Sequence, residues 1–564
     1  METAKTLELD SKVIGALPIV NHFIERLQLG HMLSKHVPSR ANLKLSHRDT
    51  LLIMIRNILL EREPLYEIAE WIAKHDRELA GLGDLVPSIL NDDRIGRSLD
   101  ALFLADRATL MTELVVLAVK EFHIALDQFH NDSTSVSVSG QYHKVPTTYR
   151  GKQSLKLKHG FSKDHRPDLK QLLYCLTVSR DGAVPVHYKT YDGNVTDDTT
   201  HIQTWEAIRR LAGRSDFTYV ADCKLCTREQ MGYIAKEGGK FVTVMPQTRS
   251  EDTWFRHWMK SNQVQWQELL RKPKSEAPDC EEDIYWGFEP PNLSEEGYRI
   301  IWILSSQKQQ LDAQVRQQKI AKTIEELDQL KQQVGSGRLK TKEQINAAVL
   351  KVFQENKSAQ WFDWKLVYVE NDKFVQKGKG RPGKDTQYEK TVTQCWSFEV
   401  LTNPSHIQED AADDGVFPLM TNHCLKSVFM KQVLQEYKYQ PYIEKRHEQF
   451  KTVFAAAPVY LKLPHRIEAL MFLYFVVLLL NALIEREVRN EMAKQEMPRL
   501  PLYPEARNCR FPATERILSI FSDHRRHTLS QRGNVLKEFV DPLNQLQQMV
   551  LGLLQVSTTC YRPP

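Results

Sequence analysis

Apolar residues in the first part of the chain follow a helical spacing. From Val13 to about Lys120 they recur at every third or fourth position, which is typical of amphipathic helices packed against one another. The segment 91–103 opens with an asparagine and two aspartates, residues that favour the start of a helix. We therefore expect a helical N-terminal domain over residues 1–118.

The spacing then changes to that of strands, and later to strands alternating with helices. Residues 122–144 end in alternating serine and valine, and residues 171–193 contain two strands joined by an Arg-Asp-Gly turn. Residues 200–213 follow as a helix, and residues 217–246 as a strand, a helix and a strand. This order predicts a layered α/β sheet, the first part of a core over residues 119–249.

The alternation stops over residues 250–396, where the apolar positions predict a helical hairpin. We interpret this stretch as an α+β insertion. Strand patterns return in the second part of the core, residues 397–497, and then give way to helices. The last part, residues 498–564, is expected to be a helical tail because residues 536–556 are amphipathic at helical spacing.

Length and composition agree with a multidomain α/β protein, in which a mixed sheet flanked by helices is interrupted by the insertion and joined to helical N- and C-terminal regions. A chain of 564 residues exceeds the size of one hydrophobic core. Its eight cysteines are scattered, and its first residues lack the pattern of a secretory signal, so we expect a cytoplasmic location. The apolar run 469–483 is shorter than the ~20 residues of a membrane span, so we expect a buried helix and no membrane.

Basic residues are concentrated in a few segments, although the net charge is only +5. They gather in residues 156–170, 377–384 and 523–532. Such clusters suit a nucleic-acid partner, because lysine and arginine neutralise backbone phosphates. The distribution therefore indicates nucleic-acid binding more clearly than the net charge does.

Two aspartates lie at the ends of expected strands. Asp132 lies where the first strand runs into a Ser-Thr-Ser segment, and Asp222 ends the apolar run that begins at Phe217. Two-metal phosphoryl transfer needs carboxylates that converge on cations about 3.5–4 Å apart, because magnesium prefers oxygen ligands. Taken singly, each aspartate is more often a turn or cap residue.

A third carboxylate lies in a segment that we expect to form one helix, residues 436–454. Tyr437, Gln440, Glu444 and Lys451 are spaced by three, four and seven residues, which places them along one helical face. Such a face could lay Glu444 on a metal while its neighbours hold DNA phosphates. The alternative, from spacing alone, is an ordinary solvated helix of mixed charge.

The acids and their surroundings resemble the signature of cut-and-paste insertion-sequence transposases of the DDE class, in which the glutamate lies inside a Tyr-x2-Arg-x3-Glu-x6-Lys helix. Six further segments resemble the family in the same order: HNDSTSVSVSGQY, HGFSKDHRPDLKQ, YDGNVTD, VADCKLCTREQM, DGVFPLMTN and LKLPHRIEALMFLYFVVLLLNALIER. The similarity spans most of residues 10–490. Two positions depart from the pattern, because Gln440 stands where the family has arginine and Pro441 where a tryptophan is common, so a phosphate contact at position 440 would carry no charge.

The resemblance implies an RNase H-like core and a role for each matching residue. Asp132, Asp222 and Glu444 would bind two magnesium ions, for which manganese could substitute, and would carry out strand cleavage and strand transfer by positioning and electrostatics. The implied contacts to transposon-end DNA come from the same helix: Tyr437, Gln440 and Lys451.

Basic residues outside that helix are further candidate DNA contacts. Lys163, Arg166 and Lys170 follow the first aspartate and would touch the phosphate backbone. Arg381 lies in a Gly-Lys-Gly-Arg-Pro-Gly-Lys segment, which resembles a short hook that lays arginine into an A·T-rich minor groove, or else is a flexible basic loop. In the N-terminal domain, the candidates for recognising terminal inverted repeats are Lys35, Arg40, Lys44 and Arg48.

Two other patterns favour the protein core. Cys223 and Cys226 have the spacing of a zinc or redox pair, but they have no second pair or nearby histidines, so we interpret them as packing residues. Trp361, Trp364 and Trp396 include candidates for stacking on a flipped base, and each is individually more typical of a core position.

We therefore expect a DNA transposase whose partner is double-stranded DNA, both the inverted-repeat ends and the target. A transposon has two ends, so we expect a homodimer in the DNA complex, with the tail as the contact. One alternative is a non-catalytic DNA-binding protein derived from a transposase. Another is a carboxylate-pair hydrolase such as a glycosidase, which would need aromatic sugar platforms and would show no salt-sensitive affinity for DNA.

Overall fold

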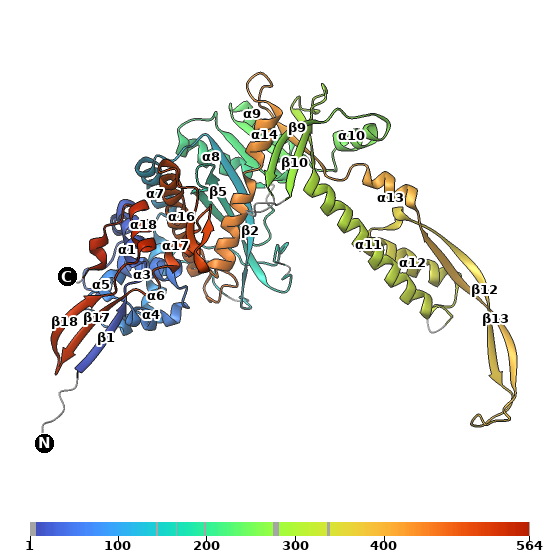
Figure 1. The fold of residues 1–564 in the computed structure, drawn as a ribbon, viewed down its shortest axis with the longest axis horizontal. Coiled ribbons are helices and arrows are strands. Elements are labelled where there is room, and N and C mark those ends of the chain that lie inside the picture. The colour runs from blue at the N-terminus through green and yellow to red at the C-terminus, as the bar shows by residue number, and fades with distance from the viewer. Residues whose placement is uncertain are drawn as a thin grey trace. The chain divides into compact units, whose positions relative to one another are not determined.

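The chain is a mixed α/β protein built from two compact units. The computed structural model describes residues 7–142, 145–164, 166–196, 199–273, 281–335 and 339–562. The first unit comprises Met1–Thr243, Thr421–Cys424 and Val433–Pro564. The second comprises Val244–Met420 and Leu425–Gln432. Figure 1 shows the elements of both.

Helices expected in the first 118 residues are present in the first unit. Several begin at side chains that accept a hydrogen bond from the first turn, as Ser46, Asn91 and Asp106 do. The helices are α1 (Leu17–Arg26), α2 (Leu29–His36), α3 (His47–Leu60), α4 (Ile68–Lys74), α5 (Arg77–Ala80), α6 (Asp92–Leu104) and α7 (Arg107–Phe122). Their apolar faces pack together, as the helical spacing predicts.

The strands of the first unit form a mixed sheet in the order β6-β5-β2-β7-β8. Strands β2, β5 and β6 are antiparallel neighbours, whereas β7 is parallel to β2 and β8 is parallel to β7. The strands are β2 (Gln128–Val138), β5 (Lys170–Ser179), β6 (Pro185–Asp192), β7 (Thr218–Ala221) and β8 (Lys240–Val244), with short β3 (Thr148–Tyr149) and β4 (Lys152–Gln153) paired separately. Helices α8 (His201–Ala212) and α9 (Arg228–Lys236) make the parallel connections. The predicted strand and helix order is confirmed here.

Helix α16 (Pro464–Lys494) forms much of the core of the first unit. It contacts α3, α6, β6 and α18 (Gln545–Leu553). By length and composition it could cross a membrane, but 94% of its most apolar window is buried inside the protein. The buried helix expected around residues 469–483 is therefore confirmed.

The C-terminal part departs from the expected helical tail. It contains strands β15 (Leu500–Tyr503), β16 (Arg507–Cys509), β17 (Arg525–Gln531) and β18 (Asn534–Val540), together with α17 (Thr514–Ser519) and α18. Strand β17 pairs with β18 and also with β1 (Leu7–Val13), so a strand precedes the N-terminal helices. Arg532 and Gly533 both have positive φ, the conformation of a tight hairpin turn, and this turn overrides the helical spacing of residues 536–540.

The second unit is larger than the expected insertion, 250–396, because strand β14 (Val416–Thr421) completes a sheet in the order β14-β11-β10-β9. The other strands are β9 (Gln267–Pro273), β10 (Glu282–Phe288) and β11 (Arg299–Ser305), and the flanking helices are α10 (Ser250–Ser261) and α13 (Pro404–Ala411). The expected helical hairpin is confirmed as α11 (Ser306–Gln333) and α12 (Lys342–Asn356).

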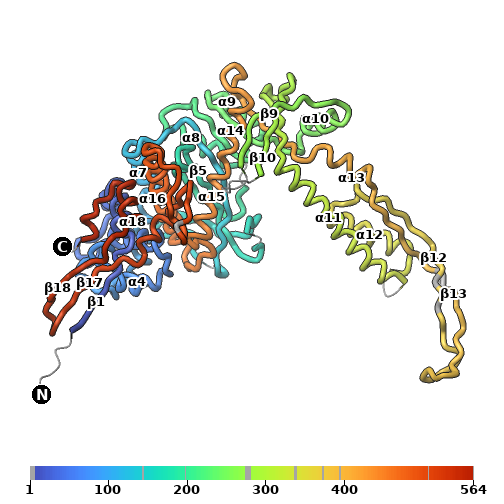
Figure 2. The backbone as a smooth tube through the Cα atoms, viewed as in Figure 1, coloured from blue at the N-terminus to red at the C-terminus, as the bar shows by residue number. Residues whose placement is uncertain are grey.

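A long antiparallel ribbon follows the helical hairpin. Strands β12 (Phe362–Gln376) and β13 (Tyr388–Thr402) pair in continuous register, and Figure 2 traces them past α11 and α12. The base of the ribbon packs on the helices around Leu327, Val349 and Phe398. The ribbon was not predicted from the sequence, because its strands alternate only weakly between apolar and polar residues.

Candidate active site

Asp132 and Asp222 lie at the same level of neighbouring parallel strands. Strands β2 and β7 pair His130 with Val220, and each aspartate is two residues further along its own strand direction. Neighbouring strands are separated by roughly 4.8 Å, and residues two apart lie on the same face of a sheet. The two carboxylates therefore start from adjacent positions on one face.

Local structure fixes Asp222 where β7 ends. Its carboxylate accepts a hydrogen bond from the Lys224 backbone N–H at 3.0 Å, which caps the short helical turn Cys223–Leu225. Its carbonyl accepts from the Thr243 hydroxyl at 2.6 Å, which ties it to β8. Asp222 is thus a cap residue and a member of the candidate site at once, so the two sequence interpretations are compatible.

Helix α15 (Gln440–Glu448) covers the same face of β2. The Gln440 side chain donates to the Asn131 carbonyl at 3.1 Å, and its Oε1 lies 2.9 Å from His130 Nδ1. Burial lowers the pKa of His130 to about 4, so this histidine is neutral at pH 7. Glu444 follows Gln440 by one helical turn on the same face, and is exposed to solvent.

Electrostatic effects connect Glu444 with Asp132, and Tyr437 with Glu444 and Asp222. Partial burial and the negative charge of Asp132 raise the pKa of Glu444 above its usual value. Burial, followed by the charges of Glu444 and Asp222, raises the pKa of Tyr437 to about 12. Asp132 and Asp222 thus start from adjacent strands, Glu444 lies within the field of Asp132, and the Tyr437 phenol lies within the field of Glu444 and Asp222.

The donor chemistry of this site suits a divalent cation. Carboxylate oxygens are the ligands that magnesium prefers, and a cation would relieve the repulsion between Asp132 and Glu444. Within the described ranges, no three histidine, cysteine, aspartate or glutamate side chains converge closely enough to form a ready ligand set. The three carboxylates therefore do not form a closed metal-ligand set in this structure.

A lysine and a histidine lie next to Asp132. Lys163 Nζ is 3.7 Å from Asp132 Oδ1 and donates to the Ser133 carbonyl at 2.5 Å. His447 Nε2 lies 3.6 Å from Asp132 Oδ2. His447 was not among the sequence candidates, although its position three residues after Glu444 on the same helical face could have indicated it.

The other predicted cations, Lys451, Arg166 and Lys170, form ion pairs or hydrogen bonds with residues other than the three acids. Lys451 Nζ donates to Asp164 at 2.5 Å, and lies in the π-helical turn η6 (Gln449–Val453) that follows α15. Arg166 forms a two-bond pair with Asp168, and Lys170 donates to the Gln141 carbonyl. Unlike these three residues, Lys163 lies directly beside Asp132.

Two expectations about the signature helix are corrected. The segment 436–454 is broken, because α14 (Met430–Tyr437) ends at Tyr437, α15 starts at Gln440 with Pro441 in its first turn, and a π-helical turn begins at Gln449. Gln440 is 6% exposed and uses both ends of its amide on β2. It fastens α15 to the sheet, so its surroundings differ from those expected of a DNA contact.

Other sequence candidates occupy ordinary structural positions. Lys35 pairs with Glu113, Arg48 pairs with Asp49, and Arg40 and Lys44 are exposed. Cys223 is half-buried and Cys226 is buried, and burial raises the pKa of the Cys223 thiol. Three tryptophans pack in or against the core of the second unit: Trp361, Trp364 and Trp396.

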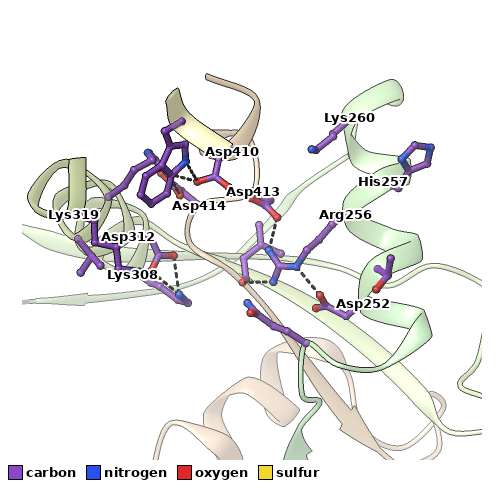
Figure 3. A pocket seen from close by; sticks show the side chains of 16 residues that line it. Asp252, Arg256, His257, Lys260, Lys308, Asp312, Lys319, Asp410, Asp413 and Asp414 are labelled. Atoms are coloured by element: carbon purple, nitrogen blue, oxygen red, sulfur yellow. Dashed lines mark hydrogen bonds and ion pairs between the residues drawn. The ribbon is translucent and has the colours of Figure 1, made fainter. Parts of the chain in front are cut away.

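A polar cleft of about 700 Å³ lies wholly in the second unit (Figure 3). Ion pairs line it, including Arg256 with Asp413 at 2.6 Å and Arg316 with Asp414 at 2.5 Å. Trp361 Nε1 donates to Asp410 at the same cleft. These paired charges tie α10 and α11 to residues 410–416, so we assign the cleft a structural role.

Comparison with known proteins gives limited information. The family described as "Domain of unknown function (DUF4277)" matches residues 9–116, the helical N-terminal part. No curated protein matches the sequence. A cryo-EM structure of a piggyBac transposase synaptic complex with hairpin DNA has a TM-score of 0.35 and 7% identity, over 90% of this chain and 78% of that chain. A similarity this weak carries no argument about fold or activity.

Proposed function

We propose that this chain is a DNA transposase of the DDE class, which binds the terminal inverted repeats of an insertion sequence and catalyses metal-dependent strand cleavage and strand transfer. One observation carries the proposal: Asp132 and Asp222 are level on adjacent parallel strands, and Glu444 lies on the helix that covers the same face, with its pKa raised by partial burial and by the charge of Asp132. Phosphoryl transfer with divalent cations requires carboxylates that can reach shared cations, and two adjacent strand positions with a facing helix supply them.

The strand order supports an RNase H-like core. Three antiparallel strands are followed by two strands parallel to the first, in the order β6-β5-β2-β7-β8. The first aspartate lies on β2, in the middle of this sheet, and the second directly follows the neighbouring β7. The second unit lies in the sequence between β8 and the glutamate helix, as an insertion in such a core would.

Asp132, Asp222 and Glu444 are the residues that would hold magnesium, or manganese in its place. Two bound cations would activate the attacking hydroxyl and neutralise the charge that develops on the phosphate. The chain's own residues fix the position of the acids: Gln440 secures α15 to β2, and Lys224 and Thr243 hold Asp222. Positioning of this kind contributes directly to the rate.

Tyr437, Lys451 and Lys163 are the proposed contacts to the DNA backbone near the acids. With a pKa of about 12, Tyr437 keeps its proton at neutral pH, so its hydroxyl can donate a hydrogen bond to a phosphate oxygen. Arg166 and Lys170 would add charge further along the same duplex. Because a transposon has two ends, we propose a homodimer in the complex with double-stranded DNA.

The test is cleavage of a plasmid carrying the DNA that flanks the coding region in its genome, with magnesium present. We expect strand cuts at the ends of flanking inverted repeats. Asp132→Asn, Asp222→Asn and Glu444→Gln should each slow cleavage by about 100-fold or more while DNA binding persists, because each removes charge stabilisation made in the transition state. Glu448→Gln, an exposed change on the same helix, is the matched control and should cleave at the wild-type rate.

Two results would contradict the proposal. Full cleavage by Glu444→Gln would remove this glutamate from the chemistry. Salt-sensitive binding of the inverted repeats without any magnesium-dependent cut would instead indicate the non-catalytic DNA-binding alternative. A carboxylate-pair hydrolase would show no salt-sensitive DNA affinity at all.

A further inference from the structure

The ribbon β12–β13 is unusually long for two strands. Its fifteen residue pairs run from Phe362 opposite Thr402 to Gln376 opposite Tyr388 without a bulge. At ~3.3 Å per residue this corresponds to about 50 Å. Strands in globular proteins are usually 3–10 residues long, and an isolated two-stranded ribbon is at best marginally stable in water. A ribbon of this length therefore needs stabilising contacts beyond the pairing of its own two strands.

Among the side chains that the structure describes, those at the base of the ribbon pack on the helical hairpin. The side chains that pack on α11 and α12 end near Leu366 on one strand and Trp396 on the other. Beyond that level the same face carries Phe374 and Tyr388, which are 66% and 54% exposed. Because Phe374 pairs with Lys390 and Tyr388 with Gln376, these two rings lie next to each other diagonally, just below the turn.

Positive charge is concentrated in the turn of the ribbon. Residues 377–387 contain four cations, Lys377, Lys379, Arg381 and Lys384, and one acid, Asp385. The adjoining strand ends, 370–376 and 388–394, contain three acids and two lysines. The two strands together carry five acids and three lysines, so the positive charge that would attract a polyanion is at the end of the ribbon.

The turn has a defined backbone. Lys377 N donates to the Gln387 carbonyl at 2.8 Å, Gly383 N to the Thr386 hydroxyl at 2.7 Å, and the Gln376 side chain to the Gly380 carbonyl at 3.0 Å. Gly380 has a φ of +145°, which only glycine adopts readily. Arg381 is thus presented, exposed, between a glycine that keeps the backbone slim and a proline that fixes it.

We propose that the end of the ribbon is a second DNA-binding site, in which Arg381 enters the minor groove of A·T-rich double-stranded DNA. The occupant follows from charge, since four cations at the end of a ribbon whose strands carry more acids than lysines complement a polyanion better than they complement a second copy of this chain. The minor groove is about 6 Å wide, is most negative along A·T tracts, and is obstructed by the guanine amino group at G·C pairs. The inference rests on the proposed DNA substrate, and it adds a sequence preference located away from the three acids.

The test measures binding of the full chain to two duplexes of equal length, one A·T-rich and one G·C-rich, by fluorescence anisotropy with magnesium chelated. The wild type should prefer the A·T-rich duplex. Arg381→Ala should lower affinity for that duplex by roughly tenfold, leave the G·C-rich duplex little affected, and reduce the salt dependence by about one phosphate contact. Lys365→Ala is the matched control, because it removes one exposed cation from the base of the same ribbon, where Lys365 pairs with Glu399.

Several outcomes would overturn the inference. They are equal binding of both duplexes by the wild type, an unchanged A·T preference in Arg381→Ala, and an equal loss in Lys365→Ala. A change in sedimentation of Arg381→Ala with unchanged DNA affinity would also overturn it, by showing that the ribbon binds protein.

Failure of this inference is separable from failure of the proposed function. The binding assay needs no catalysis, so A·T preference without cleavage would count against the enzyme only. Cleavage by wild type and Arg381→Ala alike, without A·T preference, would count against the ribbon only.

Discussion

Tyr437 is the residue on which the electrostatics of the candidate site converge. Burial raises its pKa to about 12, and the carboxylates of Glu444 and Asp222 contribute to the shift. A phenol in this field keeps its proton over the physiological range and serves as a donor. Its partner in catalysis would be a phosphate oxygen that approaches the acids.

Tyr437→Phe removes this donor and nothing else of size. We expect cleavage to slow by roughly 10–100-fold, which corresponds to loss of one hydrogen bond to a charged group. Single-turnover cleavage with enzyme in excess measures this effect apart from binding. Tyr442→Phe, an exposed tyrosine on α15, is the control. A wild-type rate for Tyr437→Phe would remove the phenol from the site.

At the residue level the sequence predicted on which strand or helix each acid lies but not every neighbour, and the catalytic role of the acids stays a proposal. Asp132, Asp222 and Glu444 could be predicted because the DDE resemblance assigns each a place on a strand or helix. Gln440 could not be placed correctly, since its spacing fits a phosphate contact as well as a buried link, and only the packing of α15 on β2 distinguishes them. Burial depends on the partner element, which one segment of sequence does not contain.

At the scale of the elements, a buried ion pair holds α15 in place. Arg446 and Glu485 of α16 lie 2.8 Å apart, and both side chains are almost fully buried. Burial alone would raise the pKa of Glu485, but Arg446 and Arg489 outweigh it and lower the pKa. Arg446 also donates to the Gly182 and Ala183 carbonyls, so it connects the glutamate helix to both α16 and the β5–β6 connection.

Removing Arg446 from this ion pair should both destabilise the first unit and displace Glu444, because Arg446 holds the helix that carries Glu444. We expect Arg446→Ala to lower the free energy of unfolding by about 3 kcal/mol, because it removes the nearer cation from the buried Glu485 and leaves Arg489, 3.5 Å away, as an ionic partner. Urea denaturation followed by tryptophan fluorescence measures this. Lys445→Ala, an exposed change one residue earlier, should cost less than about 0.5 kcal/mol. Equal stability of the two variants would contradict the anchoring role.

Element types were predicted well where the spacing is strong and poorly where one tight turn decides. The core strands β2, β5, β6, β7 and β8 carry clear apolar patterns and were placed. The hairpin β17–β18 was missed because Arg532 and Gly533 alone reverse the chain, whereas the following apolar residues match a helix equally well. Pro441 likewise ended a helix that the spacing of its neighbours would have continued.

At the scale of the whole molecule, most of the second unit is one stretch of chain inserted between two parts of the first unit. The chain leaves at Thr243 and returns at Thr421. The two crossing points are close, because the Thr421 hydroxyl donates to the Phe241 carbonyl at 2.7 Å and Phe241 N donates to Asn422 at 2.9 Å. The sequence indicated an insertion but not its limits, since β14 resembles a core strand in pattern.

Replacing residues 246–419 by a short Gly-Ser linker should therefore leave a first unit that still folds, since the linker closes a gap that the native hydrogen bonds already make narrow, and the entropy of closing a short loop is small. We expect one cooperative thermal transition by circular dichroism. The shortened protein should also lose the A·T preference in DNA binding, because Arg381 is removed with the ribbon.

Glu444→Gln in this background should still raise thermal stability when divalent ions are absent, because it removes the repulsion with Asp132 that raises the pKa of Glu444.

The sign of that last effect follows from the shift. A carboxyl whose pKa is higher in the folded state than in the unfolded state stabilises the fold below its unfolded pKa and loses that contribution as pH rises through the folded value. The gain from Glu444→Gln should accordingly appear at pH 7 and vanish below about pH 4, near the ordinary pKa of glutamate. A gain of the same size at both pH values would contradict this electrostatic origin, because a protonated Glu444 carries no charge for Asp132 to repel.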